Sequence, residues 1–547
     1  MHENINLFPQ QSNNYQRKIK DWLSRNSPFF LVSPCHFKLC QFNHLQIKYY
    51  NMKKIFIFSV LSILTFTSCQ KEIKSLDKNP LQSVQKETNA TGLKTNAINY
   101  RASVEKTFPL VFAKRKTAMQ NIENLTLERM NYLRRPEVMS SVNSSKKSVI
   151  HVPQDYSTLQ AAVDNSIDGG KIIVDGTVLQ SGNVMVDVPN LTIQGEGEED
   201  EESSTINDNS NTGDNLVVTV PGVTIKNLKL LDIGIVVNST TSAKLMNLNA
   251  RNSNPLILSV IGLFGSTNSV IKNCVITYSI LGADGVTGIG VFLDDFSNNN
   301  EVVNCKVSNT QFTAFDIEGS DNSINNCEAV DFYRGFISFD GVSTGNVFTG
   351  CVANHSYADA GFVFLNFSPN NTTVTLKNCT ANDNIFASIV DFGGSVIISN
   401  CTTSSITRNI FGPNPVGLGI LVIGGFQTGE FATVSNCTAN SNGGGGIGIV
   451  NINFEVTNNT CNNSLGVEQA NGIVLFNDSG LPMSGTVKGN TTDFNANNSI
   501  GINLIGVTNS SIINNRSMNN GVCDFNQTNC SGNTLTNNKF GSSCTGL

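Results

Sequence analysis

The chain has 547 residues, 14% of them charged, and a formal net charge of -6. The charge is uneven: residues 149–547 carry 13 basic and 33 acidic residues, whereas residues 1–148 carry 23 basic and 9 acidic ones. Nucleic acid is not an expected partner of the acidic part, because contacts with phosphate need Lys and Arg. A polyanionic glycan would also be repelled by the acidic part unless calcium bridged the glycan and the protein.

The chain begins with two segments that we do not expect in the mature fold. Residues 1–51 show no organised periodicity, and we interpret them as an upstream, non-native extension. Residues 52–69 read Met-Lys-Lys, an apolar run and Thr-Ser-Cys, which predicts a secretory signal that is too short for an ordinary membrane span. Its end resembles that of bacterial lipoprotein signals, with Cys69 as the lipidated residue. A plain secretory signal and an uncleaved anchor are the alternatives.

A polar linker follows over residues 70–148. Its first residues, Gln70-Lys71-Glu72, resemble the surface-export signal of Bacteroidetes lipoproteins. This resemblance implies an exported protein, lipid-anchored to the bacterial outer membrane or cell surface. The Lys, Asn, Thr and Ser content indicates a flexible tether. Apolar residues at helical spacing predict a short amphipathic helix near residues 115–133, in a linker that we expect to be disordered or loosely docked.

The part from residue 149 onward repeats an Asn-Cys step, with Gly in place of Asn once. The gaps between the successive cysteines are 31, 22, 24, 28, 22 and 36 residues. We take 22 as the basic turn, with loops inserted into some repeats. A period in this range indicates a solenoid, propeller or array. The repeating cysteines are Cys274, Cys305, Cys327, Cys351, Cys379, Cys401 and Cys437.

A Gly or Ala opens a short apolar strand between these steps, as at Gly290, Gly335 and Gly361. Each repeat thus holds at least two β-rich runs separated by Asn/Gly/Ser turns, and no helix-length apolar pattern. This predicts an all-β fold, a single-stranded right-handed parallel β-helix of about 12–14 rungs over residues 149–547. Its strands would bond to the rungs above and below at about 4.7–4.9 Å.

The start of this region resembles the entry segment of the pectate-lyase-like, right-handed β-helix superfamily. The resemblance is carried by residues 149–163 (VIHVPQDYSTLQAAV), 169–174 (GGKIIV) and 191–195 (LTIQG). It implies the same fold and a polysaccharide as the ligand. The superfamily contains lyases, hydrolases and epimerases, so the resemblance does not select one activity.

A helix is expected to close the first rung. Ser157 with Gln160 three residues later matches a capping box, which predicts a short N-terminal capping helix over residues 158–165. Such a cap keeps the open strand edge from pairing with another chain.

The repeated Asn and Cys have structural explanations. Asn tolerates the left-handed conformation that a sharp turn requires, and the cysteine after it would point inward as a small apolar filler that remains a thiol. A metal site is not expected, because the cysteines lack the spacing of zinc ligands. Cys523, Cys530 and Cys544 lie outside this ladder. Exported cysteines often pair, and we predict a disulfide between Cys523 and Cys530.

Acidic residues recur four or five positions after the opening Gly or Ala. Neighbouring rungs lie about 4.8 Å apart, so carboxylates on rungs one or two apart would be separated by about 5 Å or 9–10 Å. These separations suit retaining and inverting glycoside hydrolysis respectively. Crowding also raises the pKa of a carboxyl group, as a general acid requires. The acidic residues are Asp294, Asp295, Glu318, Asp340 and Asp391, with Asp316 two residues before Glu318.

Arg334 and His355 are the only Arg and His between Cys274 and Cys401. In a lyase they could neutralise a substrate carboxylate and move protons. The acidic row could instead accept turn amides or hold calcium or a sugar. Calcium could also bind the acidic run at residues 198–202, although five like charges in a row are usually solvated. No catalytic motif of the superfamily is present, so no residue roles are carried over from it.

Taken together, the residues predict an exported, lipid-anchored β-helix protein of the cell envelope that acts on or binds polysaccharide. If it is an enzyme, we expect a polysaccharide hydrolase or lyase. The alternative is a non-catalytic surface module for adhesion or scaffolding, which the absence of Trp after residue 22 favours slightly. We expect a monomer.

Overall fold

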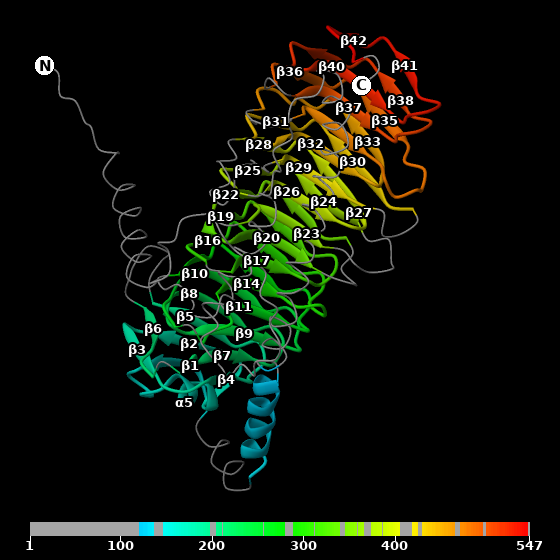
Figure 1. The fold of residues 1–547 in the computed structure, drawn as a ribbon. Coiled ribbons are helices and arrows are strands. Elements are labelled where there is room, and N and C mark those ends of the chain that lie inside the picture. The colour runs from blue at the N-terminus through cyan, green and yellow to red at the C-terminus, as the bar shows by residue number, and fades with distance from the viewer. Residues whose placement is uncertain are drawn as a thin grey trace, which may run out of the picture. The chain divides into compact units, whose positions relative to one another are not determined.

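Parallel strands stacked rung upon rung make up most of the structure, a computed structural model (Figure 1). This is the predicted right-handed parallel β-helix. The structure describes residues 117, 120–135, 146–196, 204–210, 212–254, 256–278, 288–310, 312–339, 345–357, 359–365, 373–385, 387–404, 418–424, 429–464, 471–495 and 499–544. The predicted segments 1–51 and 52–69, with Cys69, lie outside these residues, so the boundaries proposed there remain predictions.

One sheet, here called sheet B, contributes one strand to each turn. It has 14 parallel strands, which confirms the upper end of the predicted number of rungs. The strands are β4 (Val184–Val186), β7 (Asn215–Val218), β9 (Gly234–Asn238), β11 (Ser259–Phe264), β14 (Ile289–Leu293), β17 (Thr313–Ile317), β20 (Arg334–Phe339), β23 (Phe362–Leu365), β26 (Ala387–Phe392), β29 (Leu418–Ile423), β32 (Gly445–Val450), β34 (Ile473–Phe476), β37 (Ile500–Ile505) and β40 (Cys523–Thr528).

A second sheet of 25 strands, sheet A, forms the other walls, and the Asn-Cys steps are its corners. In one rung the step separates β12 (Val270–Lys272) from β13 (Val275–Tyr278). Asn273 has φ 53°, and its side-chain amide donates to Asn247 Oδ1 of the preceding rung at 3.1 Å. Cys274 is buried, and its Sγ–H donates to the Lys272 carbonyl at 3.3 Å. All seven ladder cysteines are buried free thiols, as predicted.

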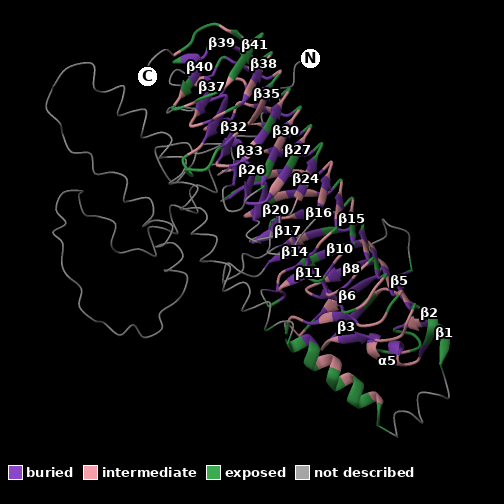
Figure 2. Cartoon of the chain, turned by 90° about the vertical axis from the view of Figure 1, so that its right-hand side faces the viewer, coloured by how far each residue is buried: buried purple, intermediate pink, exposed green. Residues whose placement is uncertain are grey.

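The interior is a continuous apolar core that runs the length of the stack, and Figure 2 shows it as buried strands along both sheets. A column of aromatic rings fills its centre. Phe336 stacks on Phe315 with ring centroids 4.6 Å apart and on Phe362 at 4.8 Å, and it meets Phe348 edge-on at 6.2 Å. Offset and edge-on contacts of this kind add to the burial of each ring.

The predicted capping helix is present as α5 (Leu159–Asp164), and it buries Leu159, Ala162 and Val163 against the core. The N-cap differs from the prediction. It is Thr158, whose hydroxyl accepts from the Ala161 amide at 3.2 Å, and not Ser157. The capping helix begins one residue later because Thr158 is the residue in extended conformation at its start.

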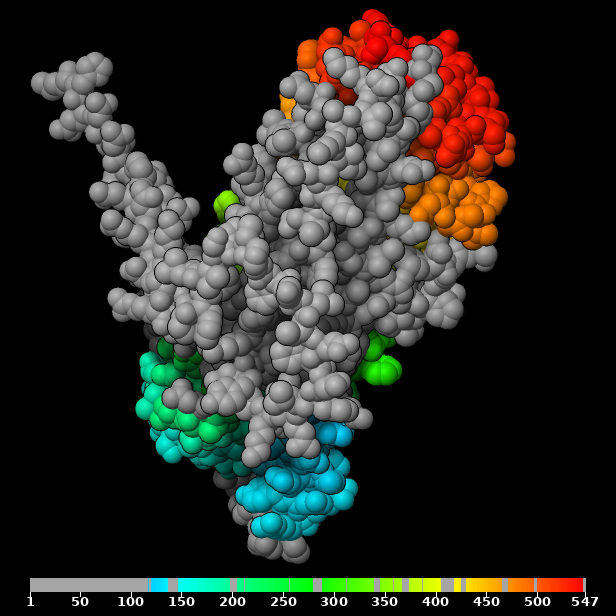
Figure 3. All heavy atoms as spheres, viewed as in Figure 1, coloured from blue at the N-terminus to red at the C-terminus, as the bar shows by residue number. Residues whose placement is uncertain are grey.

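A helix over residues 120–133 packs on the outer face of the first rungs of sheet B. Its atoms belong to the cyan group near the lower end of Figure 3. Ile122 joins an apolar cluster there with Met185 and Val217. Arg129 donates to Asp187 Oδ2 at 2.8 Å and also bridges to Asp164 of α5. The helix near residues 115–133 was therefore predicted correctly, but the expectation of loose docking was wrong.

Replacing Arg129 with Ala should loosen this helix. Two partly buried carboxylates would lose the guanidinium that they share, which should make docking of the helix less favourable by about 1–3 kcal/mol. Amide hydrogen exchange over residues 120–133 should rise while exchange in the rungs stays constant. Arg251→Ala, an exposed Arg on sheet A, is the control. Equal exchange in both variants would contradict the assigned role of Arg129.

Asp391 is a carboxyl group inside the core. It pairs in register with Phe364 and Val422, two core residues, and its side chain is 1% exposed. Burial, and then the charge of the nearby Glu430, raise the pKa of Asp391 well above its ordinary value. Asp391 therefore does not belong to the acidic row in which the sequence pattern places it, because the strand turns it inward.

The raised pKa of Asp391 predicts how stability depends on pH. The folded protein holds this proton more tightly than the unfolded chain, in which Asp titrates near 3.8. The contribution of Asp391 is therefore fully present below that value and declines as pH rises toward the folded pKa. Asp391→Asn should flatten this decline. Urea unfolding of both proteins between about pH 4 and pH 8 measures it, and parallel curves would contradict it.

The disulfide prediction was wrong in one partner. Cys523 is bonded to Cys544, with a Cα separation of 5.7 Å, and not to Cys530. The Cys530 Sγ–H instead donates to the Leu504 carbonyl at 3.5 Å, as a ladder cysteine would. The register of the last rungs explains this pairing. Cys523 is the first residue of β40, and the last described residues lie beside β40, where Phe525 and Ser543 form a β-bridge.

Cys544→Ser should destabilise the C-terminal rungs. Closing a loop of this length is worth about 3 kcal/mol in the chain-entropy model, so the loss should appear as an earlier, local unfolding step in urea. Cys530→Ser is the matched control and should leave that step in place. Thiol titration of the denatured protein should find two more thiols with reductant than without. Unchanged counts would contradict the bond.

Candidate functional site

Asp316 lies on the outer face of sheet B, in the middle of β17. Its neighbours Phe315 and Ile317 point into the core, and alternation turns Asp316 outward. In register it stands between Phe292 of β14 and Ile337 of β20. Both of these belong to apolar clusters outside the main core. Asp316 is 1% exposed, so a carboxyl group is buried between two apolar patches.

Glu318 and Asp294 complete a group of three carboxyl groups, here called the acidic cluster (Asp294, Asp316 and Glu318). Leu293 pairs with Ile317, so the residues that follow them, Asp294 and Glu318, lie on neighbouring rungs. The Glu318 amide donates to the Leu293 carbonyl at 2.8 Å. Both side chains are buried, Asp294 at 8% and Glu318 at 2% exposure. The structure therefore brings together three of the predicted residues.

The backbone spacing sets which chemistry the cluster can support. Asp294 and Glu318 stand one rung apart, about 4.8 Å, whereas Asp316 and Glu318 stand two residues apart along one strand, about 6.6–6.8 Å. Carboxyl groups about 5–5.5 Å apart suit retaining glycoside hydrolysis, and those about 6.5–9.5 Å apart suit inversion with room for a water molecule. Both separations are available within the cluster.

The carboxylate of Asp294 is engaged in hydrogen bonds with the turns around it. Its Oδ1 accepts from the Gly265 amide at 2.8 Å, from the Ser297 hydroxyl at 2.7 Å and from the Phe296 amide at 3.3 Å. Burial raises the pKa of Asp294, and these hydrogen bonds oppose the shift. The predicted alternative of turn chemistry thus holds for this residue, which leaves Asp316 and Glu318 as the pair with catalytic spacing.

The corner after Glu318 is held by a ladder of buried amides. Asn300 donates to the Ser266 carbonyl, Asn322 to Ser297 and Asn346 to Gly319, at 2.9, 2.9 and 2.7 Å. Gly319 is required there because a Cβ would lie 2.0 Å from the Ser297 carbonyl oxygen. This close approach fixes the Asp294 turn against the strand end that carries Glu318.

Two other predicted acidic residues do not extend the cluster. Asp295 follows Asp294 in the same turn and is half-buried. Asp340 lies outside the described residues, as does the acidic run at residues 198–202. Among the residues that the structure does describe, no group of three or more His, Cys, Asp or Glu side chains is arranged to hold a metal ion.

Arg334 is held by an ion pair that the sequence did not reveal. It opens β20 beside Thr313 in register, and its Nε donates to Asp359 Oδ2 at 2.6 Å. Its guanidinium also lies over the rings of Phe312 and Tyr333, with centroids at 5.7 and 5.2 Å. Arg334 is 3% exposed. Its charge is therefore compensated within the fold by Asp359, a pairing that the sequence did not predict.

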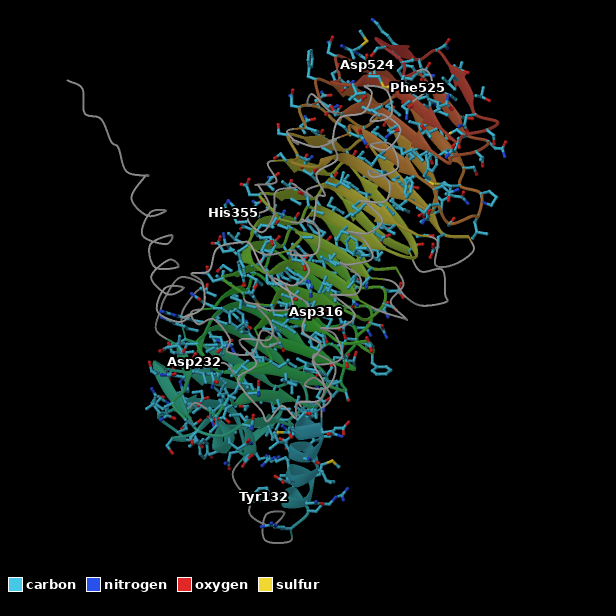
Figure 4. All side chains as sticks on the ribbon, viewed as in Figure 1. Tyr132, Asp232, Asp316, His355, Asp524 and Phe525 are labelled. Carbon is cyan, nitrogen blue, oxygen red and sulfur yellow. A yellow bond between two sulfur atoms is a disulfide. The ribbon has the colours of Figure 1, made fainter. Side chains whose placement is uncertain are left out.

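His355 lies away from the cluster. It is part of β22 (Val352–Ser356) in sheet A, at a point where the strand bends with φ 65°. Figure 4 shows it at an edge of the stack while Asp316 lies over the strands of sheet B. Its ring nitrogens are 3.8 Å from Asp331 Oδ1 and 3.4 Å from Asp383 Oδ2. Asp331 and Asp383 occupy the same corner on the rungs before and after that of His355. His355 therefore links neighbouring rungs and is not part of the acidic cluster.

No protein-family model and no curated protein matches the chain. Among solved structures, it is similar to the catalytic domain of a GH87 α-1,3-glucanase in complex with nigerose, at 14% identity and TM-score 0.41 over 72% of this chain and 69% of that one. It is also similar to an alginate lyase from Paenibacillus sp. str. FPU-7, at 14% identity and TM-score 0.34 over 53% and 94%. The periplasmic alginate epimerase AlgG matches at 10% and 0.37 over 67% and 85%. At these values the similarity carries no argument about activity.

Proposed function

We propose that this chain hydrolyses an uncharged polysaccharide on the outer face of sheet B. The observation that carries the proposal is the pair Asp316, in β17, and Glu318, directly after it, at a backbone spacing of about 6.6–6.8 Å. This spacing supports inversion, in which one group protonates the leaving oxygen and the other activates water. Burial suits a general acid, because desolvation favours the protonated form of a carboxyl group.

The charges near the cluster favour an uncharged substrate over a uronate polymer. The acidic cluster contributes three carboxyl groups, and the basic residue on the neighbouring rung, Arg334, is engaged by Asp359. A polyanion would meet like charge there. The same observation favours hydrolysis over lyase chemistry, which needs a cation to neutralise a substrate carboxylate, so Arg334 and His355 are not assigned to catalysis.

The proposal includes export. The segment 52–69 supports a lipoprotein signal with Cys69 as the anchored residue, and residues 70–116 are long enough to serve as a tether. A protein anchored in this way at the outer membrane or cell surface would meet polysaccharide directly. No helix in the described part of the chain is both long and apolar enough to cross a membrane.

The test is a degradation screen of the purified protein against neutral and acidic polysaccharides, with and without calcium. New reducing ends from a neutral glycan, without ultraviolet absorbance of unsaturated uronides, are expected. NMR of the first product should show inversion at the anomeric carbon. Absorbance on a uronate polymer would overturn the hydrolase assignment in favour of a lyase.

A second candidate is a surface module that binds glycan without turnover. The burial of Asp316 and Glu318, at 1% and 2% exposure, favours it, because a catalytic pair must meet its substrate. This candidate would be supported if the degradation screen gave no product and one of the same glycans retained the protein in a pull-down.

A further inference from the structure

Five threonines stand in register along one side of the stack, on five consecutive rungs. They begin β25 (Thr380–Asn382), β28 (Thr402–Ser404), β31 (Thr438–Asn440) and β36 (Thr491–Asp493), with Thr460 bridging between the last two. Pairing runs from Thr380 to Thr402 and on to Thr438, Thr460 and Thr491 with no shift. Strands β25, β28 and β31 follow one another along one side of the stack (Figure 1).

A second column lies two residues further along these strands and consists of Asn382, Ser404, Asn440 and Asn462. The polar groups in it are tied to one another across rungs. The Ser404 hydroxyl donates to Asn382 Oδ1 at 2.7 Å, and Asn440 Oδ1 accepts from the backbone N–H of Asn462 at 2.8 Å. The two columns together, the Thr/Asn array, form a grid of about 4.8 Å along the stack and about 6.6–6.8 Å along the strands.

The threonine hydroxyls are not used by the fold. Within the described part of the chain none of the five hydroxyl groups makes a hydrogen bond, although the residues are half-buried or, for Thr402, exposed. The strand does not require threonine at this position either. The same column on the three preceding rungs holds Lys306, Glu328 and Val352. Strand propensity therefore permits threonine at this position but does not require it on five rungs in a row.

The array is also free of charge on a strongly acidic domain. Residues 149–547 carry 33 acidic and 13 basic side chains, yet no residue of the array is charged. Lys306 and Glu328 stand in the first column on rungs before the array. Asp493 closes the array and is paired with Arg516 at 2.9 Å. No aromatic ring lies in either column. An uncharged ligand matches this surface in charge, and the lack of rings disfavours sugar rings, which pack on aromatic side chains.

We propose that the Thr/Asn array is a surface that binds ice. A ligand that contacts five rungs at once must have the same period as the rungs. A lattice of water molecules has a fixed period of this kind, whereas a flexible soluble chain has none. The rung spacing is close to the repeat of oxygen atoms in ice. The threonine methyl groups would order water between them while the hydroxyl groups join the lattice. Because the residues are held by the β-helix ladder, little conformational entropy is lost on binding.

The test compares the full-length protein with two variants in an ice-growth assay. Thr438→Lys places a long charged side chain in the centre of the array. Thr433→Lys is the matched control, because Thr433 lies on the same rung, in β30 (Phe431–Ser435), with the same half-buried exposure but outside the array. Wild type and Thr433→Lys should slow ice recrystallisation and be retained by a growing ice front, and Thr438→Lys should lose most of both effects.

Two results would overturn the proposal. One is a wild-type protein that neither slows recrystallisation nor enters ice. The other is equal activity in the two variants, both folded by circular dichroism, which would place any ice contact elsewhere. A third result would reassign the array to glycan binding: the wild type is retained on a crystalline uncharged glycan, Thr438→Lys is not, and neither protein affects ice. None of these outcomes depends on turnover at the acidic cluster.

Discussion

Glu318→Gln should lower the turnover of a neutral polysaccharide by roughly 10²–10⁴-fold, the usual contribution of a general acid or base. The amide keeps the size of the side chain but neither donates a proton to the leaving oxygen nor activates water. Asp316→Asn should have a similar effect, because inversion requires both groups. The initial rate of reducing-end release at saturating glycan is the measurement.

Glu301→Gln is the matched control. Glu301 opens β15 (Glu301–Val303) on sheet A, with its exposed side chain away from the acidic cluster. It should retain the wild-type rate. Glu318→Gln should unfold at the wild-type urea concentration, so that loss of rate reports chemistry and not folding. A folded Glu318→Gln protein with undiminished turnover would remove the pair from the mechanism and favour the binding module.

Phe336→Ala should destabilise the β-helix by about 3–5 kcal/mol, the range for deleting a buried aromatic ring. Phe336 is fully buried, and its ring contacts Phe315, Phe362 and Phe348. Truncation would leave a cavity between two neighbouring rings of the stack, which backbone hydrogen bonds on both sides hold in place. Because each rung is stabilised chiefly by its neighbours, the loss should appear as an unfolding step centred on β20.

Phe296→Ala provides the comparison for this effect. Phe296 lies in the turn after Asp294 and is 71% exposed, so its removal should change the free energy of unfolding by less than about 0.5 kcal/mol. Urea unfolding followed by circular dichroism measures both variants. Similar midpoints for Phe336→Ala and Phe296→Ala would show that the ring column does not support the stack.

The repeat can be derived from the residues along the chain alone. Asn before Cys at a recurring interval predicts a left-handed corner and an inward thiol, and both are found at Asn273 and Cys274. These features are local, because the conformation that Asn tolerates and the size that fits inside a rung depend on a few neighbouring residues. A stacked fold repeats the local solution, so the number of rungs could also be counted in advance.

The acidic cluster was predicted in part for the same reason. Asp294 and Glu318 follow apolar strands of similar length, and adjacent rungs place them side by side. Asp391 shows where this reasoning ends. It lies inside β26 and not after it, in the column of Leu293 and Ile317, one position before that of Asp294 and Glu318. A shift of one position turns a side chain from the outer face into the core.

The partners of the remaining residues depend on how the rungs stack. Arg334 reaches Asp359, 25 residues later, and Cys523 reaches Cys544 instead of Cys530. The turns between rungs differ in length, so the separation along the chain does not say which residues become neighbours across rungs. The register of the stacked strands settles this, and register is set by the burial of one whole face of each sheet and not by any single residue.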